Sequence, residues 1–541
     1  MSKDIRPFDL SIAAGRGAAA GHWLVVGKGP SSSKFEPSLA RSHNVFALNH
    51  AMGGIEALVG HAIDVEVFEH LSPDALERVE YLCVPWIPHV RQHRPLYGGK
   101  VFFGPGTQTL ADYCDTIPVL RSYRSQGRLL SYNFCSAAPS RRLPGLPYVT
   151  GYSFSAAVAL RLLAQSGATE VRTLGVDGGN AYASAFGAIA AKTKLQTAQT
   201  SFDEQFKEMA ATMKEFNTVS GPMDAGIPAR VFVGCMPEQD LAYRVLEYSI
   251  HRHSSVSVRV ERLHDAIEQS GFEVPVPRDP RNQGRTPFSF QRFAIPALCN
   301  HEGRAVYVDS DMLVLRDLRS LWMFDMHDHQ MVSAAQPAGS GRRPQFSVML
   351  IDCDRLRWNV RDVVSKLDAG ELSYEQVMYD MATVQRWAAD LPETWNSLEH
   401  YEPESTCLVH FTDMDGQPWL NPLHPHSALW SRYLLDAVRE GAISRTLVEE
   451  EVKRGHVRPS LLAQLDQDEE DALRLPFATL RRDLTEFFPP HRRQGRRLSR
   501  IKHELYRTRA LVSHVVGKGL VQPTVRAARR FASSLISAAT R

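Results

Sequence analysis

The sequence lacks the features that mark three large classes of protein. Its seven cysteines include no Cys-x-x-Cys pair, which argues against a zinc site or a disulfide framework and favours reduced, buried thiols. No apolar run approaches the roughly 20 residues that span a bilayer, and the N-terminus has no continuous apolar signal core. A net charge of +2 gives no global attraction to nucleic acid. We therefore expect a cytoplasmic protein without a transmembrane segment or a nucleic-acid partner.

What the sequence does contain is ordinary for a globular protein of several domains. It has 541 residues, of which 43% are hydrophobic and 23% charged, and this length suits two to four domains. We expect a flexible arm at 1–20, an α/β domain at 21–225, a second α/β domain at 229–440 and a charged helical tail at 441–541. Glycine and proline turns in 221–228 mark the linker.

A glycine-rich turn follows the first predicted strand. The apolar run Trp23–Val26 leads into Gly27-Lys-Gly-Pro-Ser31, where glycines let backbone N–H groups approach a phosphate, although a tight turn alone also explains them. A second predicted strand ends at Asn49. Later, Thr150-Gly-Tyr-Ser153 precedes a predicted helix, and Glu170–Asp177 is the next strand. This βαβ pattern places the functional loops at the carboxyl edge of a parallel sheet.

Two further apolar segments of this region are also predicted as strands. They are Val65–Phe68 and Tyr81–Val84. Both are short runs rich in valine and aromatic residues, a composition typical of buried strands.

The strongest chemical signal lies at the end of a strand in the second half. The run Ala305–Val308, which is rich in β-branched and aromatic residues, predicts a buried strand that ends on Asp309-Ser-Asp311. Two carboxylates so close together are costly to bury unpaired. They become favourable as ligands of Mn²⁺ or Mg²⁺, which bridge phosphates. The alternative is a solvated turn.

Two other residues become candidates because of this pair. Arg292 lies in an apolar segment just upstream, either as an arginine at the rim of the core or as a guanidinium that reaches a diphosphate. His410 ends a short apolar strand. Histidines in such places are usually core residues, but an imidazole beside two carboxylates would suit Mn²⁺.

The order of motifs in residues 229–425 resembles glycosyltransferase family 8, whose members have the GT-A fold. The matching motifs are Arg292-Phe-x-x-Pro-x-Leu298, Tyr307-x-Asp-x-Asp-Met-Leu-Val314, Phe346-Ser-Val-Met-Leu-Ile351, Leu391-Pro-x-x-Trp-Asn396, and His410-Phe-Thr412 ahead of Pro418-Trp419. The resemblance implies that Asp309, Asp311 and His410 bind Mn²⁺ or Mg²⁺, and that the metal holds the diphosphate of a nucleotide-sugar donor, a UDP-sugar.

The same resemblance implies further roles in the site. Arg292 would contact the donor, and Asn396 would help to shape the site. Gln417 stands where the family has a lysine in its Gly-x-x-Lys-Pro-Trp loop. The implied reaction is transfer of a sugar to a hydroxyl of a glycan or glycolipid acceptor, with retention of configuration.

The first domain resembles the Rossmann-like domain of family 42 sialyltransferases and of domain-of-unknown-function 115 proteins. The resemblance rests on the glycine-rich turn, the strand that ends at Asn49, the Thr150–Ser153 segment and Leu174-Gly-Val-Asp177. It implies that Gly27, Gly29, Asn49 and Ser153 line a nucleotide pocket. One departure is that the chain has no histidine between His93 and His251, where that family has its general base.

The last 50 residues are strongly basic. Residues 492–541 hold 13 lysines and arginines and a single acid, Glu504. Apolar residues recur there at helical spacing, so the segment is either a basic amphipathic helix on an anionic membrane surface or a solvated helix. The first alternative would make the protein peripheral at the inner face of the membrane.

The sequence thus predicts an α/β protein with a Rossmann-like domain, a GT-A domain and a basic helical tail. Its predicted function is metal-dependent glycosyl transfer. Two alternatives stay open. One is a non-catalytic scaffold that binds nucleotide or glycan in degenerate pockets, and the other is transferase activity in the N-terminal domain.

Overall fold

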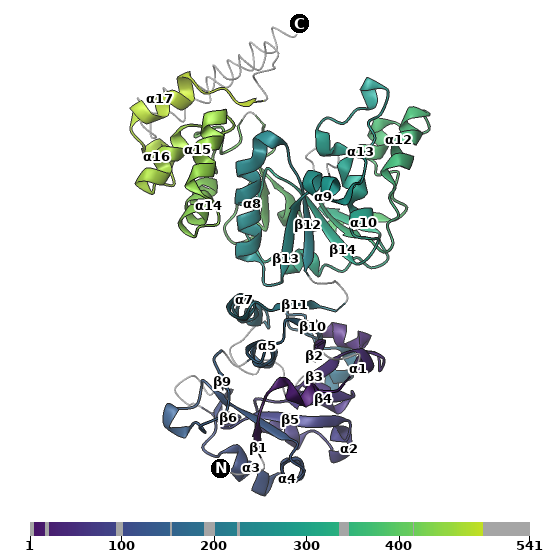
Figure 1. Ribbon diagram of the computed structural model, residues 1–541, viewed down its shortest axis with the longest axis vertical. Coiled ribbons are helices and arrows are strands. Elements are labelled where there is room, and N and C mark those ends of the chain that lie inside the picture. Colours follow the sequence, from purple (N-terminus) through teal and green to yellow (C-terminus); the bar gives the residue numbers. More distant parts are fainter. Residues whose placement is uncertain are drawn as a thin grey trace. The chain divides into compact units, whose positions relative to one another are not determined.

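The computed structural model describes eight stretches of the chain, and these form two compact units (Figure 1). The described stretches are 5–16, 21–93, 101–151, 154–188, 201–223, 228–334, 346–414 and 416–490. The first unit runs to Ala229 and includes Ser255–Ser257, and the second contains Arg230–Ser254 and the chain from Val258 onward. The predicted α/β fold is confirmed. Ser153 and the basic segment 492–541 lie outside the described residues.

The first unit is built on a parallel sheet with the strand order β1-β8-β5-β4-β3-β2-β10-β11, and β9 pairs with β8. The strands are β1 Ile5–Pro7, β2 Trp23–Val26, β3 Asn44–Leu48, β4 Ala57–His61, β5 Val79–Pro85, β8 Leu129–Phe134, β9 Tyr148–Val149, β10 Glu170–Leu174 and β11 Val219–Pro222. Because the chain order reverses between β2 and β10, the carboxyl ends of these two strands form the crevice where α/β folds usually bind ligands.

Helices cover both faces of this sheet, so its strands are apolar on both sides. Trp23 and Val25 face a core that includes α5 (Ser155–Gln165) and α7 (Glu204–Phe216). Leu24 and Val26 face the opposite core. That core is completed by α2 (Pro73–Leu76), α3 (Leu110–Thr116) and α4 (Pro118–Ser125).

The prediction of a strand at Val65–Phe68 is wrong. This segment lies in the 3₁₀ helix η5 (Val65–Glu69), and the third strand is β4 instead. Gly60 in β4 is tightly enclosed, because a Cβ there would lie 2.9 Å from both Met52 Sδ and Val79 Cγ1. The close packing of β4 therefore requires a glycine, and this glycine hides the strand from a search for apolar, β-branched runs.

The second unit contains a mixed sheet with the strand order β13-β12-β14-β17-β16-β18 and a small sheet β15-β20-β19. The strands are β12 Ala229–Gly234, β13 Val258–Arg262, β14 Arg304–Asp309, β15 Met312–Val314, β16 Met331–Ala334, β17 Val348–Asp352, β18 Trp387–Leu391, β19 Ser397–Leu398 and β20 Leu408–His410. β12 and β14 are parallel, whereas β17 is antiparallel to both of its neighbours, β14 and β16.

Two apolar cores flank the mixed sheet. One contains α9 (Leu263–Ser270), α12 (Val360–Asp368) and α13 (Tyr374–Met378). The other joins α8 (Asp240–His253) and the small sheet to the helices α14 (Ser427–Arg439), α15 (Arg445–Arg454) and α16 (Ser460–Gln467). Helices α15 and α16, which follow residue 441, thus share a core with the strands β15 and β20 that carry the site.

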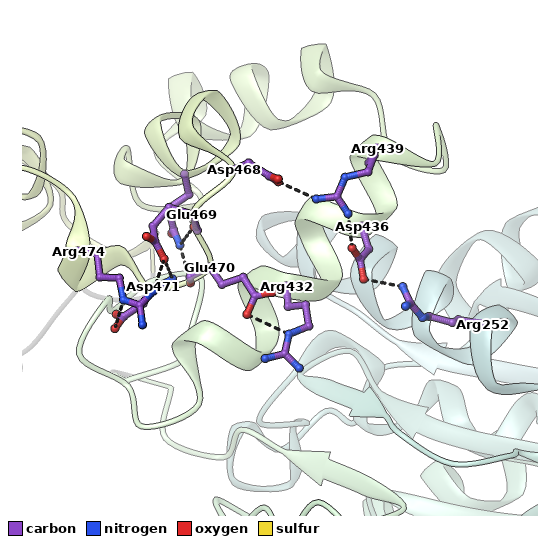
Figure 2. Close-up of polar contacts among 10 residues, drawn as sticks. Arg252, Arg432, Asp436, Arg439, Asp468, Glu469, Glu470, Asp471 and Arg474 are labelled. Carbon is purple, nitrogen blue, oxygen red and sulfur yellow. Dashed lines mark hydrogen bonds and ion pairs between the residues drawn. The ribbon is translucent and has the colours of Figure 1, made fainter.

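Ion pairs link these helices at their surface (Figure 2). Arg252 of α8 binds Asp436 of α14 at 2.7 Å, and Arg439 joins Asp436 to Asp468, also at 2.7 Å. Arg439 and Asp468 are more than half exposed, and exposed ion pairs each contribute about 0–1 kcal/mol. The apolar core therefore provides most of the packing energy here. No helix in the described part of the chain has the length and apolar character needed to cross a bilayer.

Candidate functional site

The carboxylate pair lies where the mixed sheet meets the small sheet. Asp309 is the last residue of β14, and Asp311 immediately precedes β15. β15 pairs with β20 in antiparallel register, which places Met312 opposite His410. As a result, three possible ligand atoms lie within 4.8 Å of one another, one each from Asp309, Asp311 and His410. Residues about one hundred positions apart in sequence are thus brought together.

The donor atoms of this cluster suit a divalent cation. The oxygen Asp311 Oδ1 is buried and has no hydrogen-bond partner among the described residues, and His410 Nε2 lies 3.2 Å from it. The Tyr307 hydroxyl donates to Asp309 Oδ1 at 2.6 Å. Two carboxylates and an imidazole form the mixed oxygen and nitrogen set that Mn²⁺ and similar metals accept. A buried carboxylate oxygen that faces an imidazole nitrogen is the kind of atom that such a cation satisfies.

His410 is oriented by Asn396. Its Nδ1 donates a hydrogen bond to Asn396 Oδ1 at 2.9 Å, and both side chains are buried. A proton on Nδ1 leaves the lone pair of Nε2 directed toward Asp311. Histidines that bind metals are commonly fixed by such a bond from their second nitrogen. Asn396 is therefore a positioning residue.

The pKa values in the cluster reflect its burial and its excess of negative charge. Burial raises the pKa of Asp309, and the neighbouring charge of Asp311 adds to this effect, whereas Arg292 opposes it. Burial alone would lower the pKa of His410, but the charges of Asp311 and Asp309 outweigh it and raise that pKa. A cation between these groups would relieve the repulsion between the carboxylates.

Arg292 lies beside the cluster. It belongs to the 3₁₀ helix η12 (Gln291–Ala294) and is buried. Its Nη1 donates to the carbonyl of Phe346 at 3.3 Å, and its guanidinium lies 4.8 Å from the centre of the Tyr307 ring. Its Nε has no acceptor among the described residues. Arg292 thus brings a fixed positive charge close to Asp309.

Gln417 holds Asp311 from the loop after β20. Its Nε2 donates to Asp311 Oδ2 and to the carbonyl of Phe411, both at 3.1 Å. A neutral amide holds the carboxylate in place but adds no charge. The loop after β20 is therefore tied to Asp311 by hydrogen bonds.

Several residues that support the site could not be predicted from the sequence. Ser310 is fixed by Gln239, whose Oε1 accepts its hydroxyl at 3.0 Å. Gly234 ends β12, and a Cβ there would lie 2.4 Å from Tyr307 Oη, so only glycine leaves room for the hydroxyl that binds Asp309. Such contacts between neighbouring strands leave no mark in the local sequence pattern.

Comparisons with known proteins find glycosyltransferases among the solved structures. No protein-family model matches the chain. Protein CDI from Arabidopsis thaliana is 28% identical over 221 residues, which cover 36% of this chain and 80% of that protein. The glycosyltransferase GlyE of Streptococcus pneumoniae TIGR4 is 18% identical with a TM-score of 0.28, and the match covers 38% of this chain and 59% of GlyE. The galactosyltransferase LgtC is 12% identical with a TM-score of 0.24, over 35% of this chain and 89% of LgtC.

In the first unit, the glycine-rich turn packs against the loop after β10. The N–H of Gly29 donates to the carbonyl of Gly175 at 2.8 Å, and a Cβ on Gly29 would lie 2.4 Å from Asp177 Oδ2. A Cβ on Gly27 would lie 2.4 Å from the carbonyl oxygen of Gly175. The carboxylate of Asp177 accepts the N–H of Ser31 at 2.8 Å. Close approach of two loops thus explains both glycines, and the N–H groups of Gly27, Gly29 and Ser31 already have acceptors within the unit.

A cavity of about 940 Å³ opens beside this turn, at the carboxyl ends of β2 and β3. Gly27, His50 and Phe186 are among its lining residues. His50 is 6% exposed, and neither of its ring nitrogens has a hydrogen-bond partner among the described residues. Asn49 adopts a φ of 51°, and its Nδ2 donates to Ser155 Oγ at 3.1 Å. Of the four residues predicted for a nucleotide pocket, Gly27 lines the cavity and Ser153 lies outside the described residues.

Because two of its histidines are buried, we expect acid to destabilise the first unit. Burial lowers the pKa of His61 to about 3, and burial with the charge of Lys28 lowers that of His50 to about 4. In the unfolded chain both titrate near 6.5, so unfolding takes up protons between these values. The free energy of unfolding is therefore undiminished above pH 6.5. Below pH 6.5 it falls by about 1.4 kcal/mol per histidine for each pH unit, until the pH reaches the pKa of that histidine in the folded protein.

This pH dependence can be measured by hydrogen exchange of peptides from β3 and β4 at pH 6.5 and 4.5. His61→Gln keeps a partner for the Tyr132 hydroxyl, which lies 2.9 Å from His61 Nε2, and should flatten the dependence. His22→Gln, at an exposed position, is the matched control and should leave it unchanged. Equal protection of β4 at the two pH values would contradict the prediction.

Proposed function

We propose that the second unit is a metal-dependent glycosyltransferase that moves a sugar from a nucleotide-sugar, a UDP-sugar, to a hydroxyl of a glycan or glycolipid. The observation that supports this is the cluster of Asp309, Asp311 and His410 at the end of a buried strand, with an unsatisfied carboxylate oxygen directed into it. The family-8-like order of motifs around the cluster supports the choice of reaction and its retention of configuration.

Each residue of the cluster has a distinct role in this proposal. Asp309, Asp311 and His410 hold Mn²⁺ or Mg²⁺, which supplies positive charge against the departing diphosphate. Arg292 adds a second positive charge beside Asp309 that needs no rearrangement during the reaction. Asn396 keeps the lone pair of His410 directed at the cluster, and Gln417 holds Asp311.

The test is donor turnover by the full chain with a panel of nucleotide-sugars. We expect hydrolysis or transfer with Mn²⁺, less with Mg²⁺ and none with EDTA, and a UDP-sugar as the best donor. Titration calorimetry with Mn²⁺ alone gives a readout that does not depend on knowing the donor. Donor turnover that EDTA leaves unchanged would refute the proposal, and donor binding without turnover of any donor or transfer to any acceptor would favour the scaffold alternative.

Replacement of Asn396 should weaken metal binding without removing a ligand. Asn396→Ala frees the His410 ring to rotate and to carry its proton on Nε2. Loss of such an orienting partner typically costs 10- to 100-fold in metal affinity or activity, and calorimetry with Mn²⁺ measures the change. Asn282→Ala is a control at a partly exposed asparagine of the same unit. Unchanged Mn²⁺ affinity in Asn396→Ala would show that His410 is not a ligand.

A second function is supported by the cavity of the first unit. We propose that this cavity binds a nucleotide, because it lies at the carboxyl ends of β2 and β3 and contains a buried histidine whose two ring nitrogens have no hydrogen-bond partner among the residues described. Calorimetry with CMP and UDP should detect binding that His50→Ala weakens and His22→Ala does not. Equal binding by wild type and His50→Ala would place the nucleotide elsewhere.

A further inference from the structure

Three residues that the proposed functions leave unused meet at the carboxyl edge of the first sheet. β8, β5 and β4 are adjacent and parallel, so the loops that follow them share one edge. Asp64 follows β4, His89 follows β5 and Ser136 follows β8. Ser136 Oγ lies 2.7 Å from His89 Nε2, and His89 Nδ1 lies 3.9 Å from Asp64 Oδ1.

His89 is held rigidly and is available as a base. It is 1% exposed, its ring lies 5.3 Å from that of Phe134, and its backbone N–H donates to the carbonyl of Ile63 at 2.9 Å. Its Nδ1 has no hydrogen-bond partner among the described residues, so Asp64 is the carboxylate that faces it. Burial lowers the pKa of His89 to about 4, so the ring is neutral at pH 7 and Nε2 can accept a proton.

Ser136 is the candidate nucleophile, and charged side chains lie close to the three residues. Ser136 is exposed, so its hydroxyl can reach a substrate while it bonds to a buried base. The guanidinium of Arg142 contacts the carbonyl of Ala137, next to Ser136, at 3.4 Å, and its Nε has no acceptor among the described residues. Burial raises the pKa of Asp64, and the charge of Lys28 partly opposes this rise. A nucleophile bonded to a base that faces a third group is the general signature of an activated serine.

We propose that Ser136, His89 and Asp64 form a catalytic triad that hydrolyses carboxylic esters. Ser136 Oγ forms a bond to the acyl carbon while its proton passes to His89 Nε2. The bond from that carbon to the alcohol oxygen then breaks, and the alcohol leaves with the proton from His89. Water next adds to the acyl carbon and gives its proton to His89, and Ser136 recovers a proton as the carboxylic acid departs. Asp64, whose Oδ1 faces His89 Nδ1 at 3.9 Å, is the positioning residue that stabilises the ring when it takes up the proton.

A fluorophosphonate probe on the full chain tests the nucleophile. We expect a single adduct, located on Ser136 by peptide mass spectrometry, and hydrolysis of p-nitrophenyl acetate. Ser136→Ala should abolish both. Ser140→Ala, at an exposed serine of the same loop, should label like wild type. Absence of an adduct on Ser136 in wild type would overturn the proposal.

Two further variants test the base and its orientation. His89→Gln should slow labelling at least about 100-fold, the usual contribution of a general base. Burial, with the charge of Glu66, raises the pKa of Asp64 to about 7, so the wild-type kcat should rise through this pH as Asp64 ionises. Asp64→Asn should lower kcat, leave KM unchanged and remove that rise. Labelling of Ser136 at the wild-type rate in His89→Gln, or a pH profile unchanged in Asp64→Asn, would overturn the triad.

Discussion

Asp311→Asn is expected to abolish Mn²⁺ binding and to lower donor turnover by about 100- to 1,000-fold, the scale of loss when a group that stabilises transition-state charge is removed. Asp311 Oδ1 is buried without a hydrogen-bond partner in the part of the chain that the structure describes, and His410 Nε2 lies 3.2 Å from it. The amide is similar in size but carries no charge. Its oxygen is a much weaker ligand, and its NH₂ group would face either His410 or the cation. Calorimetry with Mn²⁺ and turnover of the best donor give two independent readouts.

The matched control for this variant is Asp380→Asn. Asp380 is an exposed aspartate of the same unit, so its replacement removes the same charge from a solvated position. It should bind Mn²⁺ and turn over donor as wild type does. If Asp311→Asn retained wild-type Mn²⁺ affinity, the cluster would not be the metal site, and the proposed function of the second unit would fail with it.

Arg458→Ala is expected to destabilise the second unit by about 3–5 kcal/mol, the cost of leaving one member of a buried ion pair without its partner. The side chains of Arg458 and Asp483 are at most 1% exposed and lie 3.9 Å apart. Burial lowers the pKa of Arg458 to about 10 and raises that of Asp483. Denaturant unfolding followed by tryptophan fluorescence measures the loss.

Arg458 also connects the helices to the site. Its Nε donates to the carbonyl of Pro418 at 3.1 Å, and its backbone N–H donates to that of Trp419 at 2.9 Å. These residues follow Gln417, which binds Asp311. We therefore expect weaker Mn²⁺ binding in Arg458→Ala even under conditions where the variant is folded.

Two controls distinguish the loss of the buried ion pair from the loss of an ordinary surface charge. Arg432→Ala removes a half-exposed arginine whose partner, Glu470, lies at 3.0 Å (Figure 2), and it should cost less than about 1 kcal/mol. The double variant Arg458→Met with Asp483→Leu removes both buried charges and should recover much of the lost stability. A loss below about 1 kcal/mol in Arg458→Ala would show that the pair is not a structural element.

The sequence predicted the strands of the site because each carries its own local signal. The apolar run of β14 and its two terminal carboxylates are contiguous, and β20 is a short apolar run that ends in His410. Local pattern also located the glycine-rich turn after β2. Local pattern did not predict β4, because the strand needs Gly60 for its close packing against Met52 and Val79, and this glycine interrupts the apolar run. Such packing depends on residues that are neighbours only in the folded chain.

The sequence by itself determined the α/β class of the fold and the residue types that can bind a cation, because strand periodicity and the carboxylate pair are properties of short segments. The tertiary structure alone decided which groups meet. The register of β15 with β20 brings Asp311 to His410, and the adjacency of β8, β5 and β4 brings Ser136 to His89. Both encounters depend on pairing between distant segments. Burial of the whole sheet selects that pairing, and no local pattern encodes it.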